Sequence, residues 1–247
     1  MAQRSINTLQ TALVTGAARR IGRAIALALA AEGWQVAIHH NSSGEEAQRL
    51  ADEIQATGGR AGVLQGDLSK IEDVTGLIGK CAERFVAPTC LVNNASTFLE
   101  DTPQNLKPEV WDRHINTNLR APIFLATSFA SHLPENAQGN IINIIDQRVL
   151  RPSPEFFSYT VSKAALWNAT RTLAQALAPR IRVNAVSPGP VLQSIHQSKE
   201  DFDKEVASTL LKRACPPEEI ADAVLFILSS PSKTGQMITL DSGQHLA

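Results

Sequence analysis

Short apolar runs rich in valine, isoleucine and leucine recur along this chain of 247 residues. Apolar positions in these runs are nearly continuous, a pattern typical of strands that are buried on both faces of a sheet. We predict strands at 11–15, 34–38, 61–65, 90–94, 140–145, 182–186 and 237–240.

The segments between these runs have helical spacing. In 43–59, Ser43 and Glu46 have the spacing of a capping box, and Gly58 and Gly59 supply a stop. One apolar stripe lies between them, formed by Ala47, Leu50, Ala51 and Ile54. The alternation of about seven strands with six helices predicts one α/β domain over 1–247, with a doubly wound parallel sheet and helices on both faces.

The longest irregular stretch, 187–219, follows the sixth predicted strand. Ligands of doubly wound sheets bind at the carboxyl ends of the strands, and loops of this length are usually functional. We therefore predict a substrate lid at 190–213. The alternative is an ordinary surface loop with a short helix.

Charge is balanced along the chain, with a net charge of -1 and no block of like charges. This balance indicates a small-molecule partner rather than nucleic acid or a membrane surface. The first ten residues lack the apolar run of a signal peptide, and no segment approaches the roughly 20 apolar residues of a membrane span, so we expect a cytoplasmic protein. The cysteines show no paired metal spacing and are interpreted as reduced structural thiols: Cys81, Cys90 and Cys215.

The stretch TALVTGAARRIGRAIALALAAEG begins as a strand, turns at Gly16 and continues as a helix that contains Gly22. Backbone N–H groups at a helix start hold a pyrophosphate, and glycines let ligand and strand approach closely. At the head of an alternating α/β chain, this pattern predicts a Rossmann-type dinucleotide site. The alternative is an ordinary strand–turn–helix that does not bind a nucleotide.

The residue that ends the second strand of such a fold selects the cofactor, since an acid there binds the adenosine ribose and repels a 2′-phosphate. Here the sequence reads IHHNSS, without an acid, so NADP(H) is preferred over NAD(H). The predicted donors are Arg19, His40, Asn41, Ser42 and Ser43, although a helix N-cap explains one of the serines equally well. No metal site is predicted, because His39 and His40 are adjacent on a strand and face opposite ways.

Tyr159 and Lys163 are four residues apart and share one face of a predicted helix. A tyrosine pKa near 10 is too high for easy proton exchange at neutral pH, and a lysine ammonium one turn away is expected to lower it. Taken alone, this pair is more often a surface pattern than a catalytic one.

Several further motifs accompany the pair: TGAARRIG (15–22), GDL (66–68), NNA (93–95), INTNL (115–119), SYTVSK (158–163), SPG (187–189) and LDSG (240–243). Together they resemble the short-chain dehydrogenase/reductase family along essentially the whole chain. The resemblance implies that Tyr159 is the proton donor, that Lys163 grips the nicotinamide ribose and tunes Tyr159, and that Asn118 holds a catalytic water. It places the cofactor against Gly16, Ile21, Gly22, Asp67, Leu68, Asn94, Ala95, Pro188 and Gly189. It also implies a homotetramer formed through 103–132, 157–178 and the last strand.

Two departures from the general family pattern matter, because that pattern has glycine at Arg20 and serine at Asp146. A serine hydroxyl stabilises the oxygen of a ketone as hydride arrives, whereas an ionised aspartate opposes that charge. At about 4 Å and an effective dielectric of 20 the repulsion is roughly 4 kcal/mol. A nitrogen heterocycle reverses the argument, because its N–H groups donate to a carboxylate. Asp146 therefore favours a C=N substrate. The alternative is that Asp146 is a solvated acid after the strand, at a position that has lost the catalytic serine of the family.

The chain is similar in particular to the pteridine reductase and dihydromonapterin reductase branch, which includes alternative dihydrofolate reductases. That branch carries aspartate before the Tyr–Lys pair, two consecutive basic residues in the glycine loop, here Arg19 and Arg20, and an aromatic residue after NNA, here Phe98. The resemblance implies that Phe98 stacks on the pterin and that Ser96 and Arg20 make polar contacts with pterin and cofactor.

The predicted activity is NADPH-dependent reduction of a dihydropterin, of the dihydrobiopterin or dihydromonapterin type, with dihydrofolate as a further candidate. Hydride passes to a ring carbon, and Tyr159 with Asp146 supplies the proton. One alternative is a carbonyl reductase of small ketones or aldehydes, with Asp146 neutral. The other is a catalytically silent NADPH-binding protein on the same fold.

Overall fold

The structure is a computed structural model that describes residues 10–194 and 197–247. The predicted absence of a signal peptide concerns residues 1–10 and so lies almost wholly outside the described residues. Positions 195 and 196 of the predicted lid also lie outside them.

Seven parallel strands form one sheet in the order β3-β2-β1-β4-β5-β6-β7. This result confirms the predicted single Rossmann-type sheet, and the strands differ from the predicted ranges by a few residues at their ends. The strands are β1 (Thr11–Val14), β2 (Gln35–His40), β3 (Arg60–Gln65), β4 (Cys90–Asn93), β5 (Gly139–Ile144), β6 (Ile181–Pro188) and β7 (Met237–Leu240).

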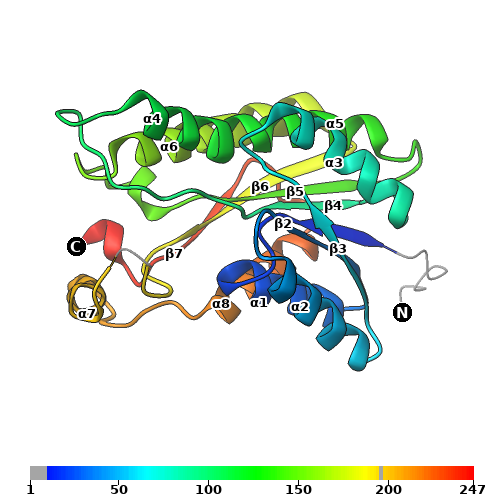
Figure 1. The fold of residues 1–247 in the computed structure, drawn as a ribbon, viewed down its shortest axis with the longest axis horizontal. Helices are drawn as coiled ribbons and strands as arrows, with labels where there is room; N and C mark the ends of the chain where they lie inside the picture. The colour runs from blue at the N-terminus through cyan, green and yellow to red at the C-terminus, as the bar shows by residue number, and fades with distance from the viewer. Residues whose placement is uncertain (1–9, 195–196) are drawn as a thin grey trace.

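Helices cover both faces of the sheet (Figure 1). One layer holds α1 (Arg20–Ala31), α2 (Gly44–Ala56) and α8 (Pro217–Leu228); the other holds α3 (Ile71–Arg84), α4 (Pro108–His114), α5 (Ala121–His132) and α6 (Phe157–Leu177). A π-helix (Ile115–Arg120) joins α4 to α5, α7 (Lys199–Ser208) lies in the predicted lid, and 3-10 helices occupy Gln147–Val149 and Gln244–Leu246. The described residues thus contain eight α-helices where six were predicted.

Alternation along β1 explains why both helical layers are needed. Ala12 and Val14 belong to the core under α1, α2 and α8, whereas Leu13 belongs to the core under α3, α5 and α6. All three side chains are fully buried. Successive side chains of a strand point to opposite faces, so an apolar run without polar interruptions requires a cover on each side.

The predicted capping box at the start of α2 is wrong. Ser43 occupies the N-cap position but makes no side-chain cap hydrogen bond. Its hydroxyl instead accepts a hydrogen bond from Arg19 at 2.5 Å, and Glu46 forms an ion pair with Arg19 at 3.6 Å. A cation from the glycine loop therefore binds the two side chains that the local pattern assigned to the helix.

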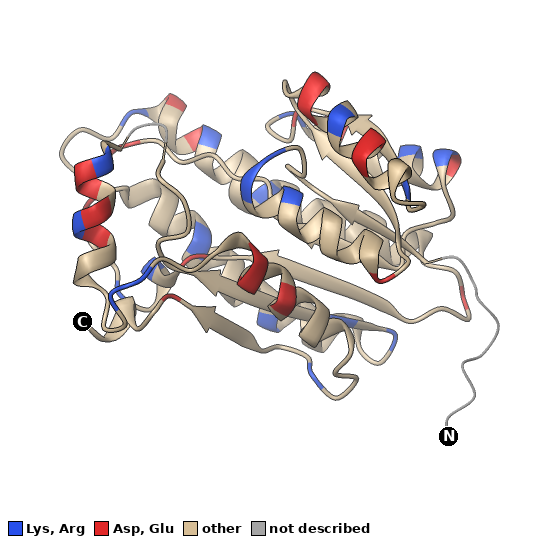
Figure 2. Cartoon of the chain, turned by 90° about the horizontal axis from the view of Figure 1, so that it is seen from below, with Lys and Arg blue, Asp and Glu red and all other residues tan. Residues whose placement is uncertain are grey.

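Basic and acidic residues are interspersed along the ribbon in Figure 2. Along α7, for example, Lys199 pairs with Asp203 and Lys204 with Glu200. Across residues 10–194 and 197–247, no helix combines the length and apolarity needed to cross a membrane.

Candidate active site

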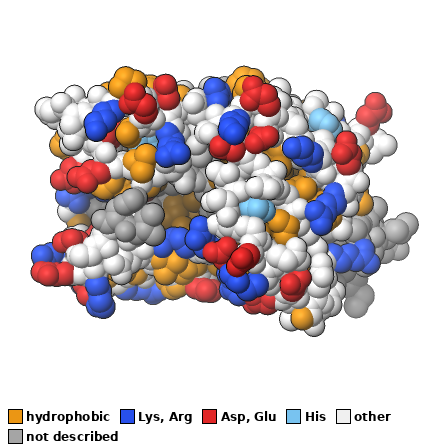
Figure 3. Space-filling view, viewed as in Figure 1, with side chains coloured by type: hydrophobic (Ala, Val, Ile, Leu, Met, Phe, Trp, Pro, Cys, Tyr) orange, Lys and Arg blue, Asp and Glu red, His pale blue; other side chains and the backbone are white. Residues whose placement is uncertain are grey.

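A cavity of about 510 Å³ opens where the strand order reverses, between the loops that follow β1 and β4. Ligands of doubly wound sheets bind at this switch point. Figure 3 shows the molecule hollowed on this face, with basic side chains at the edge of the hollow. The predicted residues that line the cavity are Gly16, Arg19, Arg20, Ile21, Gly22, His40, Asn41, Ser42, Ser43, Asp67, Leu68, Asn94, Ala95 and Ser96.

The glycine loop needs its glycines for two reasons. Gly16 has a φ of +62°, and a Cβ there would lie 2.9 Å from the Cα of Ala95. A Cβ on Gly22 would lie 2.4 Å from the carbonyl oxygen of Gly16. Neither position admits a side chain without moving backbone, so the loop can bring its N–H groups close to a ligand.

Arg20 has a positive φ of 55°, which explains why the general family pattern has glycine at this position. Its guanidinium donates to the carbonyls of Leu192 and Gln193, each at 2.8 Å. Arg20 therefore links the glycine loop to the first residues of the predicted lid.

His39 was not predicted to be a site residue. Its Nδ1 accepts a hydrogen bond from Gly16 N–H at 3.1 Å, so Nε2 carries the proton and donates to the carbonyl of Gly66, also at 3.1 Å. Burial lowers the pKa of His39 to about 4, which keeps the ring neutral. His39 thereby joins the glycine loop to the GDL motif. Only the paired strands bring Gly16 and Gly66 to it, so no local sequence signal marks this role.

The end of β2 fits an adenosine 2′-phosphate. Of the described residues that line the cavity at the end of β2, none is acidic, and Arg19 donates to Ser43 with Asn41 and Ser42 beside them. Nδ1 of His40 is buried and has no hydrogen-bond partner within the described part of the chain. An unpaired buried nitrogen of this kind is costly unless a ligand satisfies it.

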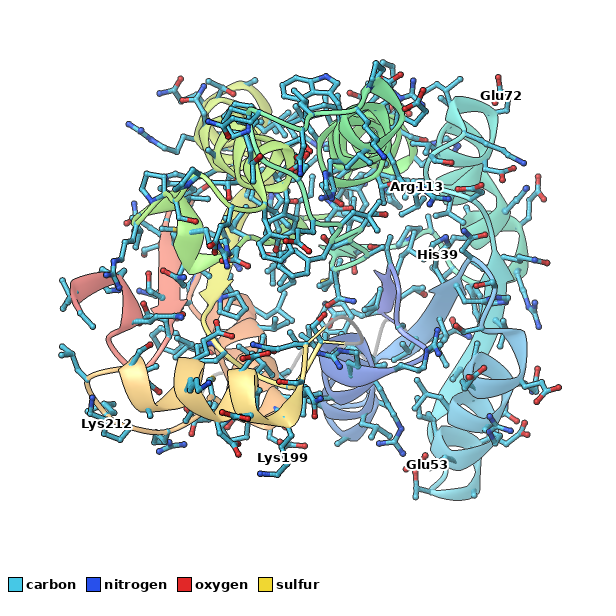
Figure 4. The ribbon with its side chains drawn as sticks, turned by 60° about the vertical axis from the view of Figure 1, so that its left-hand side comes forward. His39, Glu53, Glu72, Arg113, Lys199 and Lys212 are labelled. Carbon is cyan, nitrogen blue, oxygen red and sulfur yellow. The ribbon has the colours of Figure 1, made fainter. Side chains whose placement is uncertain are left out.

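Other cavity residues escaped the sequence prediction: Ala18, Ser69, Thr97, Arg113 and Thr117. Arg113 and His39 flank the same hollow in Figure 4, while Glu53, Glu72, Lys199 and Lys212 point outward. Asp67 accepts hydrogen bonds from the N–H and hydroxyl of Ser69, at 2.9 and 2.7 Å, which hold the GDL turn against the cavity.

At the chemical end of the site, the Tyr159 hydroxyl donates to Oδ2 of Asp146 at 2.8 Å. The other carboxylate oxygen accepts from Arg148 N–H at 2.9 Å, so Asp146 also caps a short 3-10 helix. Burial raises the pKa of Asp146, although Arg148, Tyr159 and Lys163 oppose the shift. The carboxyl group therefore holds its proton at a higher pH than a solvated aspartic acid does.

The expectation that Lys163 lowers the pKa of Tyr159 is wrong for this arrangement. Burial and the adjacent Asp146 raise the Tyr159 pKa well above its ordinary value. The Lys163 ammonium donates to the carbonyl of Ile144 at 2.8 Å, and burial lowers the pKa of Lys163 to about 8. An acid in direct hydrogen-bond contact outweighs a lysine that is 5.7 Å from the centre of the tyrosine ring.

Asn118 lies fully buried in the π-helix. Its carbonyl accepts from Thr97 N–H at 2.8 Å and from the Ser96 hydroxyl at 3.2 Å, and its amide donates to the carbonyl of Thr97 at 2.9 Å and to Ser162 at 3.2 Å. Asn118 thus holds the loop after NNA in place. The water-holding role implied by the resemblance stays a prediction.

Phe98 lies beside the acid pair, with its ring edge-on to Tyr159 at 4.6 Å between centroids. One face of Phe98 is covered by Phe156, which stacks on it at 4.1 Å and 10°. The Arg148 guanidinium lies over the Phe156 ring at 5.1 Å. Sequence reasoning missed Phe156, which a substrate ring stacking on that face would have to displace.

Pro188 ends β6, and Gly189 follows it and contacts the C-terminal segment. Gly189 N–H donates to the carbonyl of Leu240, and a Cβ on Gly189 would lie 2.7 Å from Asp241.

The three cysteines are free and buried, and burial raises each thiol pKa to about 12. No group of metal-ligating side chains occurs among the residues that the structure describes.

Comparisons with known proteins agree with this architecture. A family model described as "Enoyl-(Acyl carrier protein) reductase" matches residues 16–245. The 3-oxoacyl-[acyl-carrier-protein] reductase FabG of Staphylococcus epidermidis is 33% identical over 242 residues, which cover 96% of this chain and 99% of that protein.

Solved structures are also similar. The crystal structure of FolM alternative dihydrofolate reductase 1 from Brucella canis, complexed with NADP, is 51% identical with a TM-score of 0.94, covering 96% of this chain and 94% of that one. A short chain dehydrogenase from Burkholderia cenocepacia in complex with NADP is 33% identical with a TM-score of 0.90, covering 96% and 98%. The glycine loop, the seven-stranded sheet and these matches over nearly all of its length show that the chain belongs to the short-chain dehydrogenase/reductase family of oxidoreductases.

Proposed function

We propose that this protein is an NADPH-dependent reductase that converts a dihydropterin, of the dihydrobiopterin or dihydromonapterin type or dihydrofolate, to its tetrahydro form. The observation that carries the proposal is the 2.8 Å hydrogen bond between Tyr159 and Asp146, which pairs two acids beside Ser96, a residue that lines the cofactor cavity. Similarity to the Brucella canis protein, named as an alternative dihydrofolate reductase, supports this substrate class.

The cavity residues fit NADP(H), and the similar solved structures contain NADP. The glycine-loop N–H groups would bind the pyrophosphate, and Arg19, Asn41, Ser42 and Ser43 would bind the 2′-phosphate. Asp67 and Leu68 would flank the adenine, and Pro188 and Gly189 the nicotinamide. When bound, NADPH supplies the hydride that adds to the ring carbon of the C=N bond.

The chain itself supplies the proton. Tyr159 passes its hydroxyl proton to the ring nitrogen, and Asp146, whose pKa burial raises, returns a proton to the phenolic oxygen when it is in its acid form. The products at the protein are a neutral tyrosine and an aspartate carboxylate. Lys163, positively charged below a pKa of about 8, offsets that negative charge.

The test follows NADPH oxidation with dihydrobiopterin, dihydromonapterin and dihydrofolate, and in parallel with small ketones and a 3-oxoacyl thioester. We expect turnover of at least one dihydropterin and slow turnover of the ketones. Ketone turnover without dihydropterin turnover would contradict the proposal and favour a carbonyl reductase, which the similarity to FabG makes the main rival. NADPH binding without any turnover would favour the silent protein.

Cofactor choice gives a separate prediction. Ser42→Asp places a carboxylate where the 2′-phosphate would lie, and roughly 2 kcal/mol of repulsion should raise the KM for NADPH about 30-fold. The KM for NADH should fall or stay unchanged, since an acid binds the free ribose hydroxyls. Ser42→Asn, which adds a side chain of the same size without charge, is the matched control. An equal loss of NADPH affinity in both variants would mean that the size of the side chain at position 42, and not its charge, lowers the affinity.

The remaining expectations belong to the same proposal. Residues 190–213 act as a lid: Arg20 holds its start, and Glu205 of α7 accepts hydrogen bonds from Gln244 and Gln197. The protein is a homotetramer through 103–132, 157–178 and β7.

A further inference from the structure

The loop between β4 and α4 has no helix or strand at residues 94–102. We call its part from Ser96 to Asp101 the platform segment, because it carries Phe98. Two of its backbone N–H groups donate to side chains: Thr97 N–H to Asn118 at 2.8 Å and Leu99 N–H to Nε2 of His114 at 3.0 Å. The backbone on both sides of Phe98 is therefore held by the helical segment that contains α4 and the π-helix.

His114 extends this anchor to the catalytic helix α6. Because Nε2 accepts from Leu99, the neutral ring carries its proton on Nδ1, which donates to the Ser158 hydroxyl at 2.6 Å. The Ser158 hydroxyl in turn donates to the carboxylate of Asp101. The chain of bonds thus leaves the platform segment at Leu99 and returns to it at Asp101.

Asp101 also caps the first turn of α6. Phe156, at the N-cap position, provides no side-chain cap. Instead, Ser158 N–H donates to Oδ1 of Asp101 at 3.1 Å, and Phe157 N–H donates to the Asp101 backbone carbonyl at 3.3 Å. A carboxylate at a helix N-terminus satisfies its free N–H groups and is favoured by the helix dipole. Tyr159 is the next residue of this turn.

The trio is not a hydrolytic triad. Asp101 is 2% exposed, and His114 and Ser158 are 0% exposed, so no substrate reaches the serine. The serine lies between histidine and aspartate and already gives its proton to the acid, whereas a nucleophilic serine must give its proton to the histidine. All three polar groups are used internally, and their burial makes each bond costly to lose.

We propose that Asp101, His114 and Ser158 are positioning residues that hold the Phe98 platform and the Tyr159 proton donor at one fixed separation. This inference rests on the proposed function, in which a substrate ring lies at Phe98 while Tyr159 protonates it. A rigid separation keeps the ring nitrogen in reach of the hydroxyl, and a displacement of about 1 Å costs on the order of 100-fold in rate. None of the three residues touches substrate or cofactor.

The test is Ser158→Ala, which removes the hydroxyl that joins His114 to Asp101. We expect kcat for the dihydropterin to fall about 10- to 100-fold, with the Kd for NADPH changed less than about twofold. Amide hydrogen exchange at Leu99 should speed up. The matched control is Thr170→Val on the same helix, which removes a fully buried hydroxyl that bonds Asn143 and the carbonyl of Leu166. We expect Thr170→Val to lose about as much free energy of unfolding as Ser158→Ala does. Its dihydropterin turnover should stay equal to that of the unaltered protein.

His114→Gln is the second variant, because the glutamine side-chain oxygen can still accept a hydrogen bond from Leu99 N–H. Amide hydrogen exchange at Leu99 should therefore be slower in His114→Gln than in His114→Ala. Turnover in Ser158→Ala equal to that in Thr170→Val would overturn the positioning role and leave the proposed function intact. No dihydropterin turnover by the unaltered protein would overturn the proposed function and this inference together.

Discussion

Replacing Tyr159 with phenylalanine should lower kcat for a dihydropterin by about 1000-fold, because the ring nitrogen loses its proton donor. The Kd for NADPH should stay nearly unchanged, since the Tyr159 hydroxyl donates its hydrogen bond to Asp146, which does not line the cofactor cavity. Stopped-flow measurement of NADPH oxidation and fluorescence titration of NADPH separate the two effects.

The chain offers a direct check on the tyrosine, because Tyr159 is its only one. Phenolate absorbance followed against pH therefore reports this residue alone. The phenolate should form only at a pH well above the ordinary tyrosine range, as the raised pKa requires. A phenolate at neutral pH, or a Tyr159→Phe variant with normal kcat, would contradict the assigned role.

Replacing Asp146 with asparagine should lower kcat/KM for the dihydropterin by about 100-fold at a pH below the raised Asp146 pKa, because the amide cannot return a proton to Tyr159. The raised pKa of Asp146 gives the sign of the pH dependence. In the unaltered protein the protonated acid is present below this pKa, so kcat/KM should decline as pH rises through it. The same pH series with Asp146→Asn should lack that decline.

Asp146→Ser is the informative companion variant, because serine suits a carbonyl oxygen that gains negative charge. We expect it to lose dihydropterin turnover while ketone turnover rises and NADPH binding is kept. An equal loss of NADPH binding and turnover in both variants would mean that Asp146 serves only to cap the 3-10 helix through Arg148.

The order of strands and helices could be predicted because each apolar run carries its own periodicity. Leu13 and Val14 had to be buried on opposite faces whatever surrounded them, and both are. Glycines were also informative: Gly16 marks a turn that few other residues could make. Helices that carry little periodicity, such as α7 with none of its residues buried, were not separated from the loops around them.

The capping box and the Lys163 effect were mispredicted for one shared reason. Both rested on residues close in sequence, and in each case a charged side chain from elsewhere intervened: Arg19 binds Ser43, and Asp146 binds Tyr159. His39, Phe156 and the trio of Asp101, His114 and Ser158 have no local pattern at all. Their contacts join positions far apart in the chain, such as Ser158 and Asp101.

By itself, then, the sequence determined the α/β class, the place of the dinucleotide cavity and the identity of the acid that distinguishes this chain from the general family pattern. These depend on local periodicity, on backbone freedom at glycine and on residue chemistry. Only the tertiary structure decided that Asp146 contacts Tyr159 directly, that both pKa values rise and that Phe98 is anchored to α6. Hydrogen bonds and burial act over a few ångströms in space, so they arise only when the fold has brought distant segments together.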